Sequence, residues 1–268
     1  MSFFIIFAHC IFNNGKMLKT RVIPCLLLKE GGFVKTARFS KPRYLGDPRN
    51  IVRLFNEKEV DEIVILDIDA TRDKRKPYFD LVRDIVSEAF MPIGYGGGIT
   101  TIEDIKLLFK IGVEKVVINT QAVNKPEFIS EASERFGSQS IVASIDVKKN
   151  LFGKYKVCIE SGRKKCSVSP VEHAKAMEDS GAGEIIINSI DRDGTMEGYD
   201  IELIKSVASN VSIPVIALGG ASKLEHFRDA VNSGASAVSA GSMFVYQGVH
   251  KAVLINYPTQ DELKGYLV

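Results

Sequence analysis

The sequence predicts an α/β fold, a single (β/α)8 barrel, and two observations support this prediction. From Thr20 onward, short β-branched runs alternate with helical segments, which is typical of a parallel sheet with a helix after each strand. The chain also matches itself: Pro92 recurs as Pro214, and Gly112 as Gly234, each 122 residues later. Two (β/α)4 halves would produce this offset. An open doubly wound sheet is the alternative, and the four-unit half repeat favours closure instead.

The elements follow in the order that such a barrel requires. We expect strands at residues 21–28, 62–67, 92–95, 115–118, 141–146, 184–189, 214–217 and 237–240, where β-branched residues cluster. Helical patterns follow these strands in turn at 48–58, 78–89, 101–111, 126–136, 169–179, 201–208, 223–231 and 259–266. Two polar insertions interrupt the units. Residues 36–46 are expected to form a loop, and residues 148–165 a small hairpin after the fifth strand.

The first residues are expected to lie outside this fold. Residues 3–12 form an apolar run that is too short to span a membrane, and no Lys or Arg precedes it. We interpret residues 1–16 as an N-terminal appendage and residues 17–268 as the barrel domain. A signal peptide is the alternative, but no small-residue cleavage site follows the run.

Composition excludes several classes of function. A chain of 268 residues with 45% hydrophobic and 25% charged residues is ordinary for a globular protein. The net charge of +2, without a basic stretch interleaved with aromatic residues, argues against nucleic-acid binding. The four cysteines have neither C-x-x-C spacing nor a nearby histidine, so we expect reduced thiols in a cytoplasmic protein, with no metal site and no cofactor. The four scattered histidines are best interpreted as surface or satisfied side chains.

Glycine-rich turns end the third and seventh expected strands, on the barrel face where active sites collect. Glycine lets backbone N–H groups approach an anion closely, beside the positive end of the following helix. The fourth and eighth strands end in polar or small residues that would complete each turn. The sequence therefore predicts two phosphate cups, one from Gly97, Gly98, Asn119 and Thr120, the other from Gly219, Gly220, Gly241 and Ser242. Plain tight turns are the alternative, which the repeat disfavours.

Carboxylates also lie at these strand ends. Asp146 ends the apolar fifth strand, where an acid can exchange protons with a bound substrate. A loop cap or a salt bridge to Lys148 is the structural alternative. Asp193 after the sixth strand is a second candidate, and its loop would equally hold phosphate through the Gly194 amide. For the acids after the second strand, Asp67 and Asp69, orientation of neighbouring loops competes with a catalytic role.

The repeat reveals one missing acid. Aligning residues 26–29 with residues 145–148 places Leu27 where Asp146 would recur. A barrel with two mirrored carboxylates, one acid and one base, requires Asp or Glu at this position. Leucine has no proton to give.

Charged residues also mark the starts of four strands, on the opposite face. Arg21, Glu62, Lys115 and Glu184 would form a salt-bridged ring of alternating charge that closes the bore. A stabilising network through which nothing passes is the alternative.

Together these residues resemble the cyclase subunit of imidazole glycerol phosphate synthase, a family of histidine biosynthesis. The resemblance covers nearly all of residues 21–266 and is carried by residues 21–26, 96–99, 118–120, 131–139, 191–195 and 213–217. It implies a barrel that binds a two-phosphate ribonucleotide and receives ammonia through the bore. It also implies a heterodimer with a glutaminase subunit docked on the N-terminal face. Ring closure then yields imidazole glycerol phosphate and an aminoimidazole carboxamide ribotide.

The resemblance also implies roles for individual residues. Lys35 matches a loop lysine that contacts substrate, and Asp146 matches one of two catalytic aspartates. The ring at the strand starts matches the ammonia gate. One phosphate would be held by Gly98, Asn119 and Thr120, and the other by Asp193, Gly194, Gly220, Gly241 and Ser242.

Leu27 departs from the family pattern, which has Asp there, so the cyclase reaction needs separate testing. This variant resembles second-copy paralogues of surface-polysaccharide (lipopolysaccharide) gene clusters, where the barrel would deliver ammonia for amidation or amidination of a sugar. Two hypotheses follow: a cyclase-like lyase subunit, and a subunit that binds a phosphorylated ligand and passes ammonia on. An isomerase-type relative is weaker, because an isomerase has little use for an ammonia gate.

Overall fold

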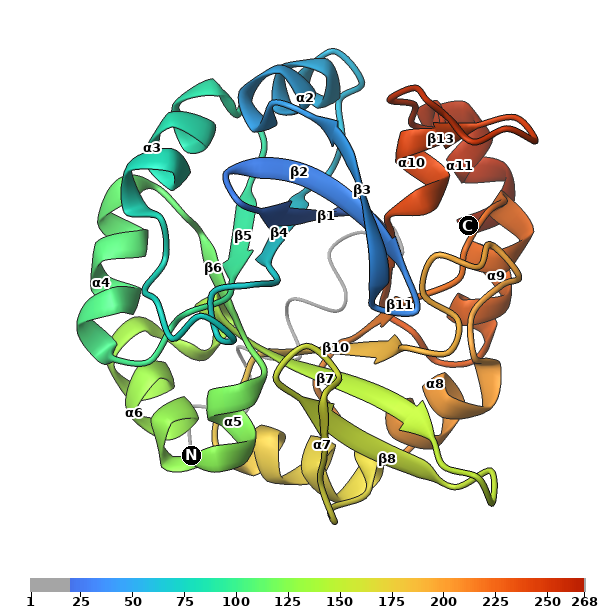
Figure 1. The fold of residues 1–268 in the computed structure, drawn as a ribbon. Coiled ribbons are helices and arrows are strands. Elements are labelled where there is room, and N and C mark those ends of the chain that lie inside the picture. Colours follow the sequence, from blue (N-terminus) through green and yellow to red (C-terminus); the bar gives the residue numbers. More distant parts are fainter. Residues whose placement is uncertain (1–19, 268) are drawn as a thin grey trace, which may run out of the picture.

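A closed barrel of eight parallel strands forms the centre of the computed structural model, which describes residues 20–267 (Figure 1). Neighbouring strands pair in chain order, and pairing of β7 with β10 closes the ring. The strands are β1 (Arg21–Lys29), β4 (Ile63–Asp67), β5 (Ile93–Gly96), β6 (Lys115–Ile118), β7 (Ile141–Lys149), β10 (Glu184–Ser189), β11 (Val215–Leu218) and β12 (Ala237–Ala240). The predicted barrel is confirmed and the open sheet is wrong. The predicted appendage, residues 1–16, lies outside the described residues.

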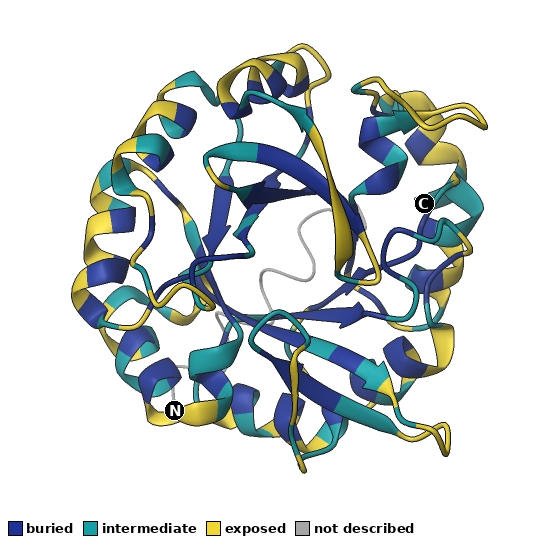
Figure 2. Cartoon of the chain, viewed as in Figure 1, coloured by how far each residue is buried: buried dark blue, intermediate teal, exposed yellow. Residues whose placement is uncertain are grey.

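A ring of helices surrounds the strands and buries only its inner side (Figures 1 and 2). All eight predicted helices are present within a few residues of their expected ends. They are α2 (Pro48–Asn56), α3 (Phe79–Glu88), α4 (Ile102–Ile111), α6 (Glu127–Phe136), α7 (Pro170–Asp179), α8 (Ile201–Ala208), α9 (Leu224–Asn232) and α11 (Gln260–Leu267). None of these helices, nor any other in the described part of the chain, is long and apolar enough to cross a membrane.

Residues 36–46 form a strand ribbon, so the loop predicted there is wrong. β2 (Gly32–Ala37) pairs antiparallel with the end of β1, and β3 (Ser40–Gly46) pairs with β2. The sequence gives little sign of β3 because five of its seven residues are exposed and it therefore lacks the apolar alternation of a half-buried strand. The predicted hairpin at 148–165 is confirmed: β7 continues into β8 (Tyr155–Ile159), which pairs with β9 (Lys164–Lys165).

Several short elements escaped prediction. They are α5 (Thr120–Asn124), η1 (Ser138–Ser140), α10 (Ser242–Val245), β13 (Tyr246–Gln247) and β14 (Ala252–Val253). Runs of two to five residues are too short for hydrophobic periodicity to identify. Two of them, α5 and α10, begin at predicted phosphate-binding residues.

The strands separate two apolar clusters. On β1, Val22, Leu26 and Leu28 pack outward against the helices, whereas Ile23, Cys25 and Leu27 point into the barrel. This alternation is the period of two that a strand imposes on its side chains. The inner cluster continues through Val64, Val117, Val142, Ile186, Ile216 and Leu218. The lumen of the barrel is therefore lined by apolar side chains between its two ends.

Candidate functional site

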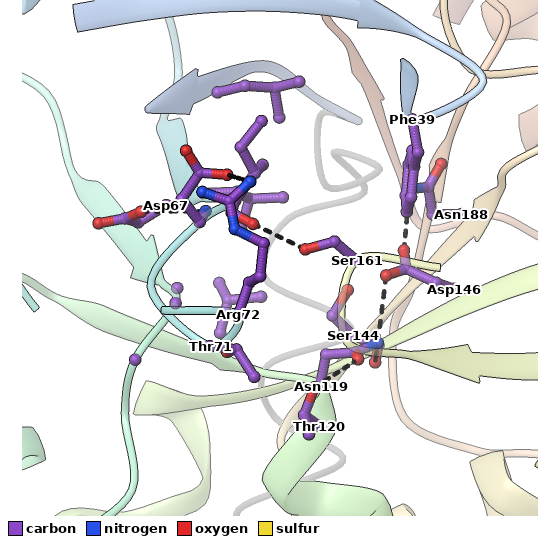
Figure 3. Close-up of a pocket in the computed structure, with 18 of the residues that line it drawn as sticks. Phe39, Asp67, Thr71, Arg72, Asn119, Thr120, Ser144, Asp146, Ser161 and Asn188 are labelled. Atoms are coloured by element: carbon purple, nitrogen blue, oxygen red, sulfur yellow. Dashed lines mark hydrogen bonds and ion pairs between the residues drawn. The ribbon is translucent and has the colours of Figure 1, made fainter. Parts of the chain in front are cut away.

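A cavity of about 380 Å³ opens at the carboxyl ends of the strands (Figure 3). Its base is apolar, with Cys25, Leu27, Leu66, Val117 and Leu218 from the inner cluster. Polar side chains from the strand ends and from both insertions form its walls. The polar lining residues include Lys35, Arg72, Asn119, Thr120, Ser144, Asp146, Ser161, Arg163, Asn188 and Asp193.

The residues of the first predicted phosphate cup come together in this cavity. Gly97, Gly98, Asn119 and Thr120 all line it, with the two glycines at φ 111° and 72°. A Cβ at Gly97 would lie 2.3 Å from the backbone oxygen of Asp67, so the turn also requires glycine for close packing. The tight-turn interpretation thus holds beside the phosphate-binding one, and both apply to the same residues.

Only some of the residues predicted for the second phosphate line the cavity. Asp193 and Gly241 line the cavity, but Gly194, Gly219, Gly220 and Ser242 do not. The β2–β3 ribbon covers this side, since the Arg38 amide donates to the Asp193 carbonyl oxygen at 2.8 Å. The second phosphate cup stays a prediction. The buried Ser242 hydroxyl has no hydrogen-bond partner among the described residues.

Asp146 lies in the cavity wall at the end of β7. Its carboxyl accepts hydrogen bonds from the amides of Asn188 at 3.0 Å and Asn119 at 3.3 Å. Among the described residues, these two amides are its hydrogen-bond partners, and no ion pair joins it to Lys148. Burial raises the pKa of Asp146 to about 7, opposed by the Asn188 hydrogen bond, and the nearby Asp193 charge raises it further. A carboxyl that titrates near neutral pH is suited to general acid or base catalysis.

Lys35 reaches the cavity from β2 and is paired. Its Nζ lies 2.8 Å from Asp193 Oδ1, and both side chains are nearly buried. The Thr36 hydroxyl donates to the other carboxylate oxygen of Asp193 at 3.4 Å. The ion pair ties the β2–β3 ribbon to the loop after β10 and places one cation and one anion at the cavity wall.

Leu27 stands in the cavity where the repeat would place a second acid. It pairs with Leu66 on β4 and with Val34 on β2, and its side chain belongs to the inner apolar cluster. No proton donor or acceptor is therefore available from this position, and the acid–base pair expected from the repeat has one member.

Asp67 and Asp69 are engaged in holding the loop after β4. Arg75 donates to both carboxylate oxygens of Asp67, at 2.6 and 2.7 Å. Asp69 pairs with Lys29 at 3.0 Å and with Arg72 at 2.9 Å. These contacts favour the loop-orienting interpretation of both acids.

At the other end of the barrel, the four predicted floor residues meet in one ring. Arg21 donates to Glu62 and to Glu184, each at 2.5 Å. Lys115 Nζ lies 3.0 Å from the same two carboxylates. The glutamate side chains are 4% and 13% exposed, so the ring is a largely buried network of balanced charge. Attraction to the two glutamates raises the pKa of Arg21 against the opposing effect of burial.

Sequence reasoning missed several cavity residues. Asn188 faces Asp146 directly because β7 and β10 are paired in register, which only barrel closure establishes. Ser161 and Arg163 enter from the β8–β9 hairpin, and the Ser161 hydroxyl donates to the Ile68 carbonyl oxygen at 2.7 Å (Figure 3). The polar end of the sixth strand was a usable signal for Asn188. The hairpin residues required the fold.

Comparison with known proteins identifies the relatives of this arrangement. The sequence profile of the family described as "Histidine biosynthesis protein" matches residues 21–251. A Pseudomonas aeruginosa protein named "Putative imidazole glycerol phosphate synthase subunit hisF2" is 50% identical over 248 residues, 92% of this chain and 99% of the relative. A Vibrio vulnificus protein named "Putative imidazole glycerol phosphate synthase subunit hisF3" is 45% identical over 254 residues, 94% of this chain and 98% of the relative. The imidazole glycerol phosphate synthase subunit HisF of Endomicrobium trichonymphae is 46% identical over 231 residues, 86% of this chain and 89% of that protein.

Proposed function

Because the chain belongs to the histidine biosynthesis family and matches its HisF subunits, we propose that it is the cyclase-type subunit of a glutamine amidotransferase complex. In this proposal a glutaminase subunit docks on the N-terminal face of the barrel and releases ammonia at the floor. The ammonia passes the ring of Arg21, Glu62, Lys115 and Glu184 and crosses the lumen. It then meets a bis-phosphorylated ribotide in the cavity at the other end.

The observation that supports this proposal is the two-ended arrangement of one barrel. A charged ring closes one end, the lumen above it is apolar, and the cavity opens at the other end. An apolar lumen admits neutral ammonia more readily than ammonium, because burying an unpaired charge is costly. An isomerase of the same fold would have little use for an ammonia gate.

Each cavity residue has a role in the proposed reaction. Gly98, Asn119 and Thr120 would hold one phosphate beside the start of α5. Asp193, Gly194, Gly220, Gly241 and Ser242 would hold the other. Asp146 would take and return the proton during addition of ammonia and ring closure, and Lys35 would contact the substrate.

The assay for ring closure is direct. The purified chain receives the two-phosphate ribotide and ammonium chloride, and imidazole glycerol phosphate is followed with time. We expect formation of the product and its loss in Asp146→Asn. Absence of product, with normal binding of the ribotide by calorimetry, would remove the cyclase reaction and leave the binding site.

Leu27 favours a second candidate function. The barrel would bind a phosphorylated ligand and pass ammonia to another acceptor, as in amidation or amidination of a surface-polysaccharide sugar. Ammonia passage does not require an acid at Leu27, whereas a two-carboxylate ring closure does. Wild-type turnover equal to that of an ordinary cyclase would exclude this candidate, and rescue of an inactive wild type by Leu27→Asp would support it.

A further inference from the structure

Two amides from neighbouring strands hold the Asp146 carboxyl. Asn188 on β10 lies opposite Asp146 in the parallel register, and its Nδ2 donates to Oδ1 at 3.0 Å. Asn119 follows β6 on the other side, and its Nδ2 donates to Oδ2 at 3.3 Å and to the Ser144 carbonyl oxygen at 2.9 Å. Each carboxyl oxygen therefore has its own donor, and the carboxyl plane is fixed between three strands (Figure 3).

The Asn188 side chain is itself tightly placed. Asn188 is 4% exposed, and a Cβ at Gly219, just after β11, would lie 2.8 Å from its Oδ1. The absence of a side chain at Gly219 thus leaves the space that the Asn188 amide occupies. The Asn188 Oδ1 has no hydrogen-bond partner among the described residues. Within that part of the chain, the side chain therefore makes its hydrogen bond to Asp146.

We propose that Asn188 is the positioning residue of Asp146, holding its carboxyl toward the cavity and setting the balance between its charged and neutral forms. The proposal rests on the proposed function, in which Asp146 exchanges protons with the substrate. Because Leu27 has no proton to exchange, a single carboxyl has to serve as both donor and acceptor. This requires that neither form dominates at the working pH.

The opposing forces on Asp146 explain why Asn188 matters. Burial favours the neutral carboxyl and raises its pKa, whereas the N–H donated by Asn188 favours the carboxylate. Without that donor the neutral carboxyl would be favoured more strongly, and a smaller fraction of it would be available as a base at neutral pH. Asn119 does not replace it, because the Asn119 amide donates to Asp146 Oδ2 and to the Ser144 carbonyl oxygen and has no third N–H for Oδ1.

The test is an NMR titration of the full chain labelled with ¹³C at the aspartate carboxyl carbons. The Asp146 resonance is assigned by its loss in Asp146→Asn, and its midpoint is compared in Asn188→Leu and Asn188→Asp, which both keep the shape of asparagine. We expect the Leu variant to raise the midpoint by about one pH unit, a tenfold change in proton affinity. The Asp variant should raise the upper midpoint of the pair further, because two facing carboxylates repel each other.

Ser189→Ala is the matched control, because it alters the same strand at a buried position that makes no bond to Asp146. Its midpoint should equal that of the wild type. An unchanged midpoint in Asn188→Leu would overturn the proposal, and if that variant does not fold, an unchanged upper midpoint in Asn188→Asp would do the same. The titration needs no substrate, so a failed cyclase assay would not contradict the positioning role of Asn188. An unchanged midpoint, in turn, would not contradict the proposed cyclase function.

Discussion

Replacing Arg21 by alanine tests whether the ring at the floor controls entry to the lumen. Arg21 is the residue that bridges Glu62 and Glu184 with two separate nitrogens, and its side chain is 29% exposed. Without it, two largely buried carboxylates share one cation, Lys115, at 3.0 Å, and the ring carries one net negative charge. Removing one partner of a buried ion pair costs about 3–5 kcal/mol.

The partial exposure of Arg21 and the remaining Lys115 contacts reduce this cost. We therefore expect Arg21→Ala to lower the free energy of unfolding by about 2 kcal/mol. For a chain of this size that corresponds to a fall in melting temperature of about 4–8 °C. Arg53→Ala is the matched control, because it removes an arginine–glutamate pair from the outer surface, where Arg53 is 56% exposed. Its melting temperature should change little.

The activity assay uses the complex with its glutaminase and compares two nitrogen sources. We expect Arg21→Ala to change glutamine-dependent activity severalfold, because ammonia must then pass an altered floor. Activity with added ammonium chloride should match the wild type, since that ammonia enters the cavity from solution. Equal effects on both nitrogen sources would refute a gating role, and the ring would then be a stabilising network.

Three further predictions concern the cavity and the core. Leu27→Asp should raise ammonium-dependent ring closure at least about tenfold. It should also lower the free energy of unfolding by about 2–4 kcal/mol, because a carboxyl then enters the apolar cluster. An unchanged rate in a folded variant would contradict the expected gain in ring closure. Burial raises the pKa of Asp146 to about 7, so the stability of the wild type should fall as the pH rises from about 4 through 7. Over that range, the free energy of unfolding of Asp146→Asn should rise by up to about 4 kcal/mol relative to that of the wild type, as measured by urea unfolding. Burial lowers the pKa of His173 to about 4, so its contribution to stability is present above pH 6.5 and lost as the pH falls through 4; His173→Leu should flatten this acid limb, and an unchanged limb would mean that other groups cause it.

The fold and the floor ring were predictable because both follow from regularities along the chain. Arg21, Glu62, Lys115 and Glu184 each lie at or next to a strand start, and strand starts in a closed parallel barrel share one face. Asp146 was predictable for the same reason at the opposite face. Its pairing with two amides was not, because one partner lies just after β6 and the other on β10, and their places beside Asp146 depend on register.

The sequence did not predict which residues of the second phosphate cup would face the cavity, for a different reason. The repeat relates Gly219 to Gly97, and each half carries an antiparallel ribbon, β2–β3 after β1 and β8–β9 after β7. The repeat does not show how closely each ribbon packs on the neighbouring loops. The β2–β3 ribbon packs so closely on the loop after β10 that a Cβ at Gly194 would lie 2.4 Å from the Thr36 carbonyl oxygen. An insertion, whose strand character was hidden by its polar sequence, decides which cup faces the cavity in this structure.

The floor ring and the cavity lie at opposite ends of the barrel and would serve different steps of the proposed reaction. Leucine at position 27 therefore affects these two steps differently. Stability alone does not call for the ring, because a buried ion-pair network can often be replaced by apolar side chains of similar volume without loss. Its position at one end of an apolar lumen is where the proposed passage of ammonia would require it, and the Arg21→Ala assay separates this role from stability. Leu27 lies at the far end of that lumen and continues its apolar lining into the cavity. In the proposed function, leucine at this position supplies no acid for ring closure but extends the apolar path that ammonia would follow, so ammonia transfer and ring closure must be assayed independently.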